Sequence, residues 1–411
     1  MKKVLFYVGA IFICATGLSQ QFEEAKLDES SFENLKVRVG ADFAMQFQGI
    51  NHQSDSIELI SLGSGINLPT ANMVIEADLA KGIKVNLETY LSSRHHVEAW
   101  VKGGYLLMDE LQFLNSDFIN RVMESTTLKI GVMELNYGDA HFRRSDNGRV
   151  IQNTFVGNYI MDAFTTAPAL EVMVRHNGIM ILGGINSGSL KPALSGYNAS
   201  TGEYAEYNMF EELALHWKAG YDRQITDDLR LRVTLSGFHC FNHHFGSLYN
   251  GDRTGSRYYL VMKPQTNNAS DVDPASGHTS GRWGPGFTDK NNAIMTNLFG
   301  KYKGLELFGT FEYTTGTSAI GGAEFTYQQF AVEGLYRFGR NEQFYGGVRY
   351  NLASNHNDES VNRIQAGAGW FLTKNIMAKA EYVNQKYKDF GLYRSADAGF
   401  SGIMVEAAIS F

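Results

Sequence analysis

Histidine and cysteine side chains cluster at one place in the chain, where His239-Cys240 is followed by His243-His244. Both residue types are zinc ligands, so the cluster raises the question of a metal site. A strand through this stretch puts His239 and Cys240 on opposite faces, and the spacing matches no standard zinc motif. Asp271 and Asp273 could hold calcium, but no ladder of EF-hand ligands follows them. We therefore predict neither a metal nor a cofactor.

Catalytic signatures are also missing from the sequence. It contains no Gly-x-Ser-x-Gly elbow, no Walker loop and no Rossmann fingerprint, and His95-His96 fits a solvated turn. The formal net charge of −7 argues against nucleic acid as a partner. We predict that the chain is not an enzyme. The alternative is a Ser/His site on the outer wall of a barrel, which no local motif would reveal.

Opposite charges gather between residues 135 and 149. Charged rings at a narrow point of a pore set its ion preference, so this segment is a candidate constriction. A second interpretation is a solvated or self-paired loop on the outside. The candidate side chains are Tyr137, Asp139, His141, Arg143, Arg144, Asp146 and Arg149.

The elements that must position these residues repeat with a period of two. From Lys36 to Gln48, apolar residues alternate with polar or small ones, as in a strand with one apolar face. The sequence predicts sixteen such strands, which are Lys36–Gln48, Met73–Leu79, Ile83–Leu87, Val97–Val101, Leu128–Val132, Leu170–His176, Ile179–Ser187, Leu213–Tyr221, Leu229–Leu235, Ile294–Tyr302, Leu305–Tyr313, Gln328–Phe338, Phe344–Leu352, Ile364–Trp370, Ile376–Tyr382 and Ile403–Phe411.

The connections between these strands alternate in length. Short links include Lys81-Gly82, Asn177-Gly178, Lys303-Gly304, Gly339–Glu342 and Thr373–Asn375. Long links include Asn51–Ala71, Asn136–Pro168, Gly188–Glu211, Phe241–Asn291 and Lys386–Ser401. Outer-membrane barrels have short periplasmic turns and long extracellular loops. The pattern predicts that architecture, with a short Tyr258–Val261 hairpin in the longest loop.

The N-terminus reads as an export signal. Met1-Lys2-Lys3 precedes an apolar run from Val4 to Ala15, and small residues before position 20 favour a cut after Ser19. We predict a cleaved signal peptide over 1–19, a short periplasmic segment over 20–34 and an outer-membrane barrel over 35–411. Cys240 then stands alone, so no intrachain disulfide forms.

One turn on the short-turn side is long. Met108–Thr126 carries Leu111, Leu114, Phe118, Ile119 and Val122 at near-helical spacing. It is interpreted as a short periplasmic helix capping the barrel or, alternatively, as a docking site for a periplasmic partner. At the other end, a terminal Phe411 in an amphipathic strand resembles the signal by which outer-membrane barrels are recognised for insertion.

These observations predict an all-β fold, a transmembrane antiparallel up-and-down barrel of about 16 strands in the cell outer membrane. In hydrocarbon every backbone N–H and C=O must be paired, so only helices and closed barrels can span. A barrel of sixteen strands is too wide for wall side chains to fill and leaves an aqueous channel by default.

The strand that ends near Tyr137-Gly138, followed by a polar loop, resembles the phosphate-selective porin O/P family and related porins of Gram-negative outer membranes. The resemblance implies diffusion of small anions through a water-filled channel, often in a trimer. This sequence departs from the anion-selective members, because its inward polar faces mix bases and acids. The candidate lining residues are Arg38, Asp42, Lys84, Glu98, Lys102, Arg230, Arg232, Arg349 and Arg363. We carry no phosphate site over to any residue.

The predicted function is passive diffusion of small hydrophilic solutes or ions through a porin. The alternative is a barrel plugged by its loops, acting as a surface-binding protein or as a subunit of an outer-membrane transport or secretion complex. Expected partners are outer-membrane lipid and lipopolysaccharide, the barrel-assembly machinery, and further copies in a homotrimer or other envelope proteins.

Overall fold

A computed structural model of the chain describes residues 20–27, 32, 34–92, 98–188, 197–198, 203–204, 213–241, 248–249, 254–266, 277–287, 290–318, 322–391 and 398–411. The predicted signal peptide lies outside the described residues, as do His95, His96, His243, His244, Asp271 and Asp273.

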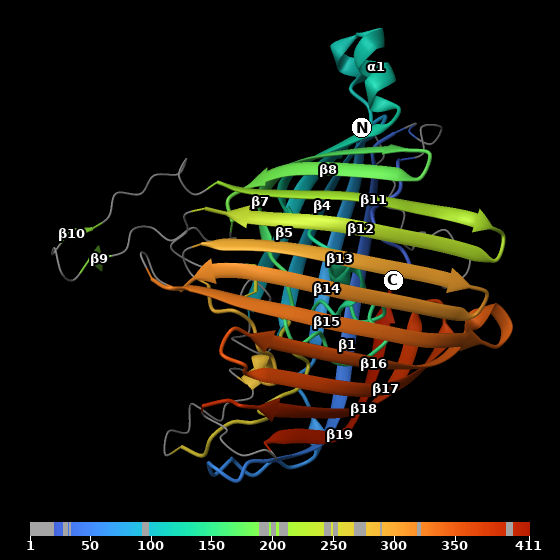
Figure 1. Ribbon diagram of the computed structural model, residues 1–411. Helices are drawn as coiled ribbons and strands as arrows, with labels where there is room; N and C mark the ends of the chain where they lie inside the picture. The colour runs from blue at the N-terminus through green and yellow to red at the C-terminus, as the bar shows by residue number, and fades with distance from the viewer. Residues whose placement is uncertain are drawn as a thin grey trace.

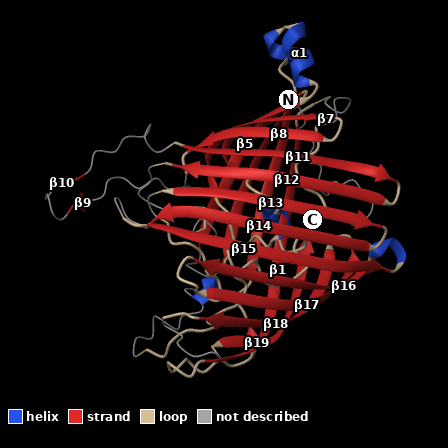
Figure 2. Cartoon of the chain, in the orientation of Figure 1, coloured by secondary structure: helices blue, strands red, loops and turns tan. Residues whose placement is uncertain are grey.

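Within the described ranges, sixteen strands form one closed antiparallel barrel (Figures 1 and 2), as the alternating pattern predicted. The barrel strands are β1 (Lys36–Gln53), β3 (Thr70–Ala80), β4 (Ile83–Ser92), β5 (Glu98–Met108), β6 (Thr126–Glu134), β7 (Thr166–His176), β8 (Ile179–Asn186), β11 (Ala214–Thr226), β12 (Leu229–Cys240), β13 (Asn291–Tyr302), β14 (Leu305–Thr317), β15 (Glu324–Phe338), β16 (Phe344–Asn355), β17 (Ser360–Thr373), β18 (Ile376–Lys388) and β19 (Gly399–Ser410). The short strands β2 (Gly65–Ile66), β9 (Tyr197–Asn198) and β10 (Glu203–Tyr204) lie in loops.

The first strand closes the barrel. β1 pairs with β3 along its first half and with β19 along its second, from Asp42 opposite Ser410 to Gln53 opposite Gly399. Phe411, just past β19, exchanges backbone hydrogen bonds of 2.8 and 3.0 Å with Ala41. The long β1 therefore satisfies both edges of the sheet, as a span through hydrocarbon requires.

The outer face of the barrel is apolar. On β1, Phe43, Met45 and Phe47 are 41–42% exposed, while Ala44 and Gln46 between them are buried. Near the short-turn rim, aromatic rings of neighbouring strands stack in the order Tyr336, Phe338, Phe344 and Trp370. An apolar band edged by an aromatic girdle is the lipid-facing surface of an outer-membrane barrel.

The short turns lie on one rim, as predicted. Asn177 and Gly178 both have positive φ, which is the geometry of the tight turn that matches strand twist. The strands run further than the sequence suggested at one link, because β11 extends to Thr226 and β12 begins at Leu229. The predicted hairpin at Tyr258–Val261 is wrong, since residues 254–262 contain no strand and nearly all of them are buried.

The long turn on this rim forms the predicted helix, but it does not cap the barrel. The 3-10 turn η2 (Gln112–Leu114) and α1 (Asp117–Met123) stand off the rim in Figure 1. Phe113 and Phe118 are 68% and 72% exposed, so this turn buries little of its apolar surface in the chain itself. No helix in the described ranges has the length and apolar character to span a bilayer.

Candidate functional site: the barrel lumen

Residues 135–165 leave β6 and fold into the lumen. The Tyr137 hydroxyl donates to Glu312 of β14 over 3.1 Å, and the Asp139 amide donates to Asn297 of β13 over 2.7 Å. Gly138 has φ of 67°, and a Cβ there would lie 2.2 Å from the Met295 sulfur. Only glycine permits both that backbone and that approach. The interpretation of this segment as a solvated external loop is therefore wrong.

The far end of the same segment reaches the opposite wall. Asp146 and Arg149 form a two-residue bridge around a tight turn, with backbone hydrogen bonds of 2.9 and 3.0 Å. Gly148 in this turn lies so close to β1 and β3 that a Cβ would be 2.7 Å from the Asp42 carbonyl oxygen and 2.8 Å from the Ala71 Cα. The segment thus crosses the lumen from β13 and β14 to β1 and β3, which narrows it as a constriction loop would.

Asp139 is the acidic anchor of this crossing. Its carboxylate accepts two hydrogen bonds from Arg232 (2.7 and 2.8 Å) and one from Thr234 (2.7 Å), and Lys218 lies 3.0 Å away. Burial opposes its ionisation, but Lys218 and Arg232 outweigh burial and hold the pKa of the Asp139 carboxyl well below its usual range. This carboxylate is therefore committed to holding the loop.

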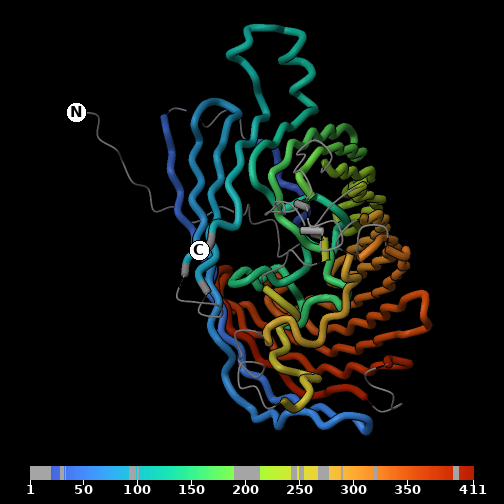
Figure 3. The backbone as a smooth tube through the Cα atoms, turned by 90° about the vertical axis from the view of Figure 1, so that its left-hand side faces the viewer, coloured from blue at the N-terminus to red at the C-terminus, as the bar shows by residue number. Residues whose placement is uncertain are grey.

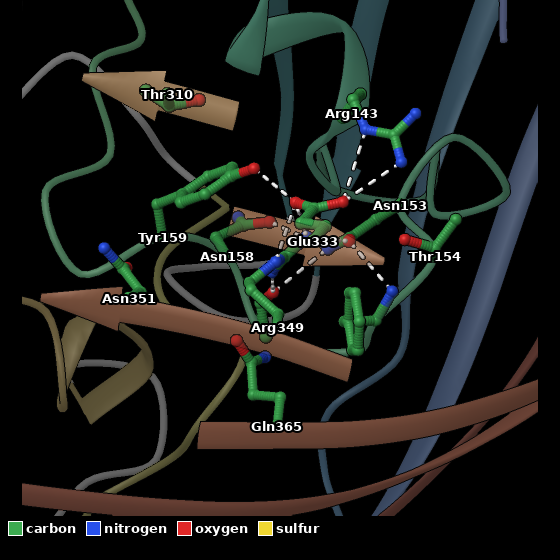
Figure 4. A network of polar contacts seen from close by, with 12 residues as sticks. Arg143, Asn153, Thr154, Asn158, Tyr159, Thr310, Glu333, Arg349, Asn351 and Gln365 are labelled. Carbon is green, nitrogen blue, oxygen red and sulfur yellow. Dashed lines mark hydrogen bonds and ion pairs between the residues drawn. The ribbon is translucent and has the colours of Figure 1, made fainter. Parts of the chain in front are cut away.

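Arg143 joins the loop to β14 and β15. Its guanidinium contacts Glu306 at 2.6 Å and Glu333 at 3.0 Å. Glu333 also pairs with Arg349 at 2.8 Å and accepts a hydrogen bond from Tyr159, so one carboxylate gathers three loop and wall groups (Figure 4). Both Arg143 and Glu333 are 1% exposed, and such charges are tolerated only when fully paired.

Three more charged groups of the loop, Arg144, Asp146 and His141, are also paired. Arg144 binds Asp162 within the same loop at 2.6 Å and stacks on Phe164. Asp146 accepts from the Tyr90 hydroxyl at 2.5 Å and forms an ion pair with Lys102 of β5. The His141 ring contacts the Glu134 carboxylate of β6. Local self-pairing exists, but it takes place inside the barrel.

Parts of the loop between β12 and β13 fill the lumen beside residues 135–165. Tyr249 donates to Glu312 over 2.8 Å, Tyr258 donates to Glu381 over 2.6 Å, and Arg257 pairs with Glu406. Apolar side chains of both loops pack together against the wall residues Phe238, Met295 and Phe400; they include Leu135, Val156, Ile160, Leu248, Val261 and Phe287. Part of the lumen is therefore a dry core of loop side chains.

The chain's N-terminal segment is a third occupant. Residues 20–27 lie inside the short-turn end of the barrel, where Phe22 is 8% exposed and packs edge-on against Phe142 and Phe299. Glu24 lies 2.9 Å from Lys84, and the Tyr105 hydroxyl donates to it over 2.7 Å. The sequence did not predict this placement; it separated residues 20–34 only as a short periplasmic segment.

The lining candidates whose side chains the structure describes face the lumen but differ in exposure. Half-buried Arg38 pairs with Asp78 at 2.6 Å, and Arg230 pairs with Asp222 at 2.7 Å. The remaining described candidates are buried; they are Asp42, Lys84, Lys102, Arg232, Arg349 and Arg363. Glu98 begins β5, and its side chain lies outside the described residues.

Charged side chains on one side of the lumen are partly exposed to water. The inner charges of β3–β6, hereafter the accessible wall, include Glu88, Lys129 and Glu134, which are 12%, 20% and 25% exposed. Arg149 faces this wall and is exposed. The carboxylates that attract its charge are Glu88, Asp42, Glu134 and Asp146. Arg149 is the exposed member of the seven predicted constriction residues.

No family model and no curated protein matches the chain. Among solved structures, the anion-selective porin from Comamonas acidovorans aligns with 11% identity and TM-score 0.53 over 92% of this chain and 100% of that one. The fold is that of the outer-membrane porins. The outer membrane channel DcaP of Acinetobacter baumannii (11% identity, TM-score 0.52, 94% and 100% covered) and Pseudomonas putida OprB (9%, 0.52, 91% and 94%) agree.

This porin-like barrel belongs in the outer membrane. The phosphate-selective type implied by the Tyr137-Gly138 resemblance stays a prediction. Within the described ranges no group of His, Cys, Asp or Glu has the arrangement of a metal site. His239 instead accepts a hydrogen bond from Trp217 over 3.1 Å, and Cys240 is buried.

Sequence reasoning missed two sets of lumen residues. Glu88 and Glu134 surround Arg149, but their strands gave no sign of which loop would meet them. The Phe22-Glu23-Glu24 triplet was a local signal, because an aromatic and two acids begin three residues after the predicted cut. Its partners lie on β4, β11 and β12, far along the chain.

Proposed function

We propose that the barrel is a narrow diffusion channel for small hydrophilic solutes and ions, with its passage between Arg149 and the accessible wall. The observation that carries the proposal is the line of partly exposed charges on this side of a lumen that the loops fill along β14, β15 and β19. The line consists of Arg38, Glu76, Glu88, Lys129, Glu134 and Arg149. Polar linings of this kind suit hydrated solutes.

The charges along the passage balance one another. Arg149 is a single exposed cation among Glu88, Glu134, Asp42 and Asp146, and several of these acids already have a partner. Because charge at the narrowest point sets ion preference, we propose weak selectivity in which Arg149 decides the sign. Nothing in this arrangement resembles a dedicated phosphate site, so we do not propose phosphate as the preferred solute.

The packed core of the two loops favours a second function. Val156, Tyr258 and Val261 are 0–2% exposed within the lumen, and Arg257 bonds to the inner face of β19. Loops so firmly fixed suit a plugged barrel that serves as a surface-binding protein or as a subunit of a larger envelope complex. This function requires that the passage along the accessible wall be closed to ions.

Membrane placement and partners follow from the channel proposal. We propose that the chain is exported through a cleaved signal, inserted by the barrel-assembly machinery through its Phe411 end, and surrounded by lipid and lipopolysaccharide. A homotrimer is the assembly we propose for it, because the porin family that the Tyr137-Gly138 stretch resembles often forms trimers.

The test is single-channel conductance of the refolded chain from residue 20 in a planar bilayer, followed by a salt gradient. We expect stable but small current steps, because the loops occupy much of the lumen. The reversal potential then gives the sign set by Arg149 against the surrounding acids. The absence of current from a barrel that is shown to be folded, by the change in its gel migration on heating, would contradict the channel and support the plugged barrel.

A further inference from the structure

The N-terminal segment occupies its cleft as a ligand occupies a binding site. The Glu23 carboxylate receives two hydrogen bonds from one guanidinium, at 2.7 and 2.8 Å from the Arg232 nitrogens. Lys218 lies 3.5 Å from the same carboxylate. The side chains of Arg232 and Lys218 are 0–1% exposed. The cations of the cleft are therefore buried and do not lie at the protein surface. A two-point arginine contact is specific for a planar oxyanion such as a carboxylate.

The same arginine also contacts an aromatic ring. The Arg232 guanidinium carbon lies 4.2 Å from the centre of the Phe22 ring, and that of Arg230 lies 5.4 Å away. The rings of Phe142 and Phe299 meet the Phe22 ring edge-on, at 5.8 and 5.3 Å between centres. Cations over the face and ring edges around it make an aromatic cage. One cleft thus recognises a ring and a carboxylate together.

The occupant is held as a terminal segment and not as part of the sheet. In the described part of the chain, residues 20–27 join no strand. Gln21 and Ala25 are exposed, and the Glu24 side chain is 36% exposed beside Lys84 and Lys129 of the accessible wall. The cleft therefore lies beside the proposed passage, and no strand pairing holds its occupant.

We propose that this cleft is a binding site for small aromatic carboxylates and that the Phe22-Glu23 pair is their internal competitor. The ring of the solute takes the place of Phe22 between Phe142 and Phe299. Its carboxylate takes the place of Glu23 on Arg232 and Lys218. This inference rests on the proposed channel, because it names the class of solute that the passage delivers to the cleft.

The experiment truncates the competitor and offers the solute. We compare the double variant F22A/E23A with the parent and with Q21A, which changes an exposed neighbour of the same segment. Calorimetry on the refolded, detergent-solubilised chains measures binding of phenylacetate, cyclohexylacetate, acetate and phosphate. We expect F22A/E23A to bind phenylacetate about tenfold or more tightly than the parent or Q21A does. We also expect F22A/E23A to bind cyclohexylacetate, acetate and phosphate more weakly than it binds phenylacetate. Adding R232Q, or the milder R230Q, should weaken that binding.

Equal phenylacetate binding by F22A/E23A and Q21A would overturn the proposal. Phosphate or acetate binding as tight as that of phenylacetate would overturn its aromatic part, since the cleft would then read charge alone. Conductance of the same chains is recorded separately. A silent barrel that binds phenylacetate contradicts the channel and not the cleft, whereas a conducting barrel that does not bind it contradicts the cleft alone.

Discussion

On β14, β15 and β19, which form the sealed wall, the inward carboxylates Glu306, Glu333 and Glu406 are 0–1% exposed. On the accessible wall, Glu76 and Glu88 are 15% and 12% exposed. Both walls carry the same alternating pattern, and both pair their acids with Arg or Lys. The difference arises because the two loops deliver arginines, tyrosines and apolar side chains to the sealed wall. Alternation fixes which way a side chain points, whereas the loops decide whether it meets water.

The two walls also differ in how far their neighbouring strands pair. β14 and β15 pair over thirteen residues, from Leu305 to Thr317, whereas β5 and β6 pair over five, from Gly104 to Met108. Gly131 of β6 has φ of 141°, and a Cβ there would lie 2.4 Å from the Gly104 carbonyl oxygen. The accessible wall is therefore the less regular part of the sheet. Its irregularity coincides with the place where the constriction loop leaves the wall.

The largest expected effect comes from the sealed wall. Arg349→Ala leaves Glu333 with one guanidinium fewer and removes the hydrogen bonds to Asn153 and Gly157. Breaking a buried ion pair costs about 3–5 kcal/mol. Unfolding by guanidinium chloride in lipid vesicles should therefore show a loss of this order in the free energy of unfolding. Arg38→Ala is the matched control, because Arg38 and its partner Asp78 are 27% and 19% exposed and the loss of this pair should cost about 1 kcal/mol or less. Equal losses would erase the contrast between the walls.

A smaller loss of stability is expected where the loop meets β13. Gly138→Ala must adopt a positive φ and place a Cβ against the Met295 sulfur. We expect a loss of about 1–3 kcal/mol together with a change in current, because the constriction loop must shift. Gly346→Ala is the control, since a Cβ there meets its nearest atom at 3.9 Å. Unchanged unfolding and conductance in Gly138→Ala would show that the loop is not held at this point.

The smallest effect on stability, and a clear one on selectivity, is expected at the passage. Arg149→Glu reverses an exposed charge among carboxylates and should move the reversal potential in a salt gradient toward cations by several-fold in permeability ratio. Arg121→Glu makes the same change on α1, outside the barrel, and should leave the potential within error. A potential that ignores Arg149→Glu would place the passage elsewhere.

Much of the fold could be predicted from the sequence, because strand alternation and turn length are local signals. All sixteen predicted segments lie within or overlap the barrel strands, and the inward residues of β1 follow from its period of two. The view of the barrel in Figure 3, turned by 90° from Figure 1, shows the central green and yellow loops within the ring of strands. The segment between residues 135 and 149 was a candidate constriction because opposite charges gather in it.

The contents of the lumen could not be predicted in the same way. Arg143 meets Glu333 across 190 residues of sequence, and Tyr258 meets Glu381 across 123. No period or spacing encodes such contacts, since they depend on how two loops fold against each other. The N-terminal segment was hidden for the same reason, because its partners Arg232 and Lys218 lie about two hundred residues away.

The most direct test of the account is chemical modification of single cysteines during current recording. Arg149→Cys faces the accessible wall, and Gln365→Cys replaces a fully buried residue of the lumen bonded to Glu381 and Tyr258. In a chain from residue 20, whose native Cys240 is buried, a charged methanethiosulfonate reagent should cut the current of Arg149→Cys and leave that of Gln365→Cys and the parent unchanged. Block of Gln365→Cys without block of Arg149→Cys would contradict a passage along β3–β6.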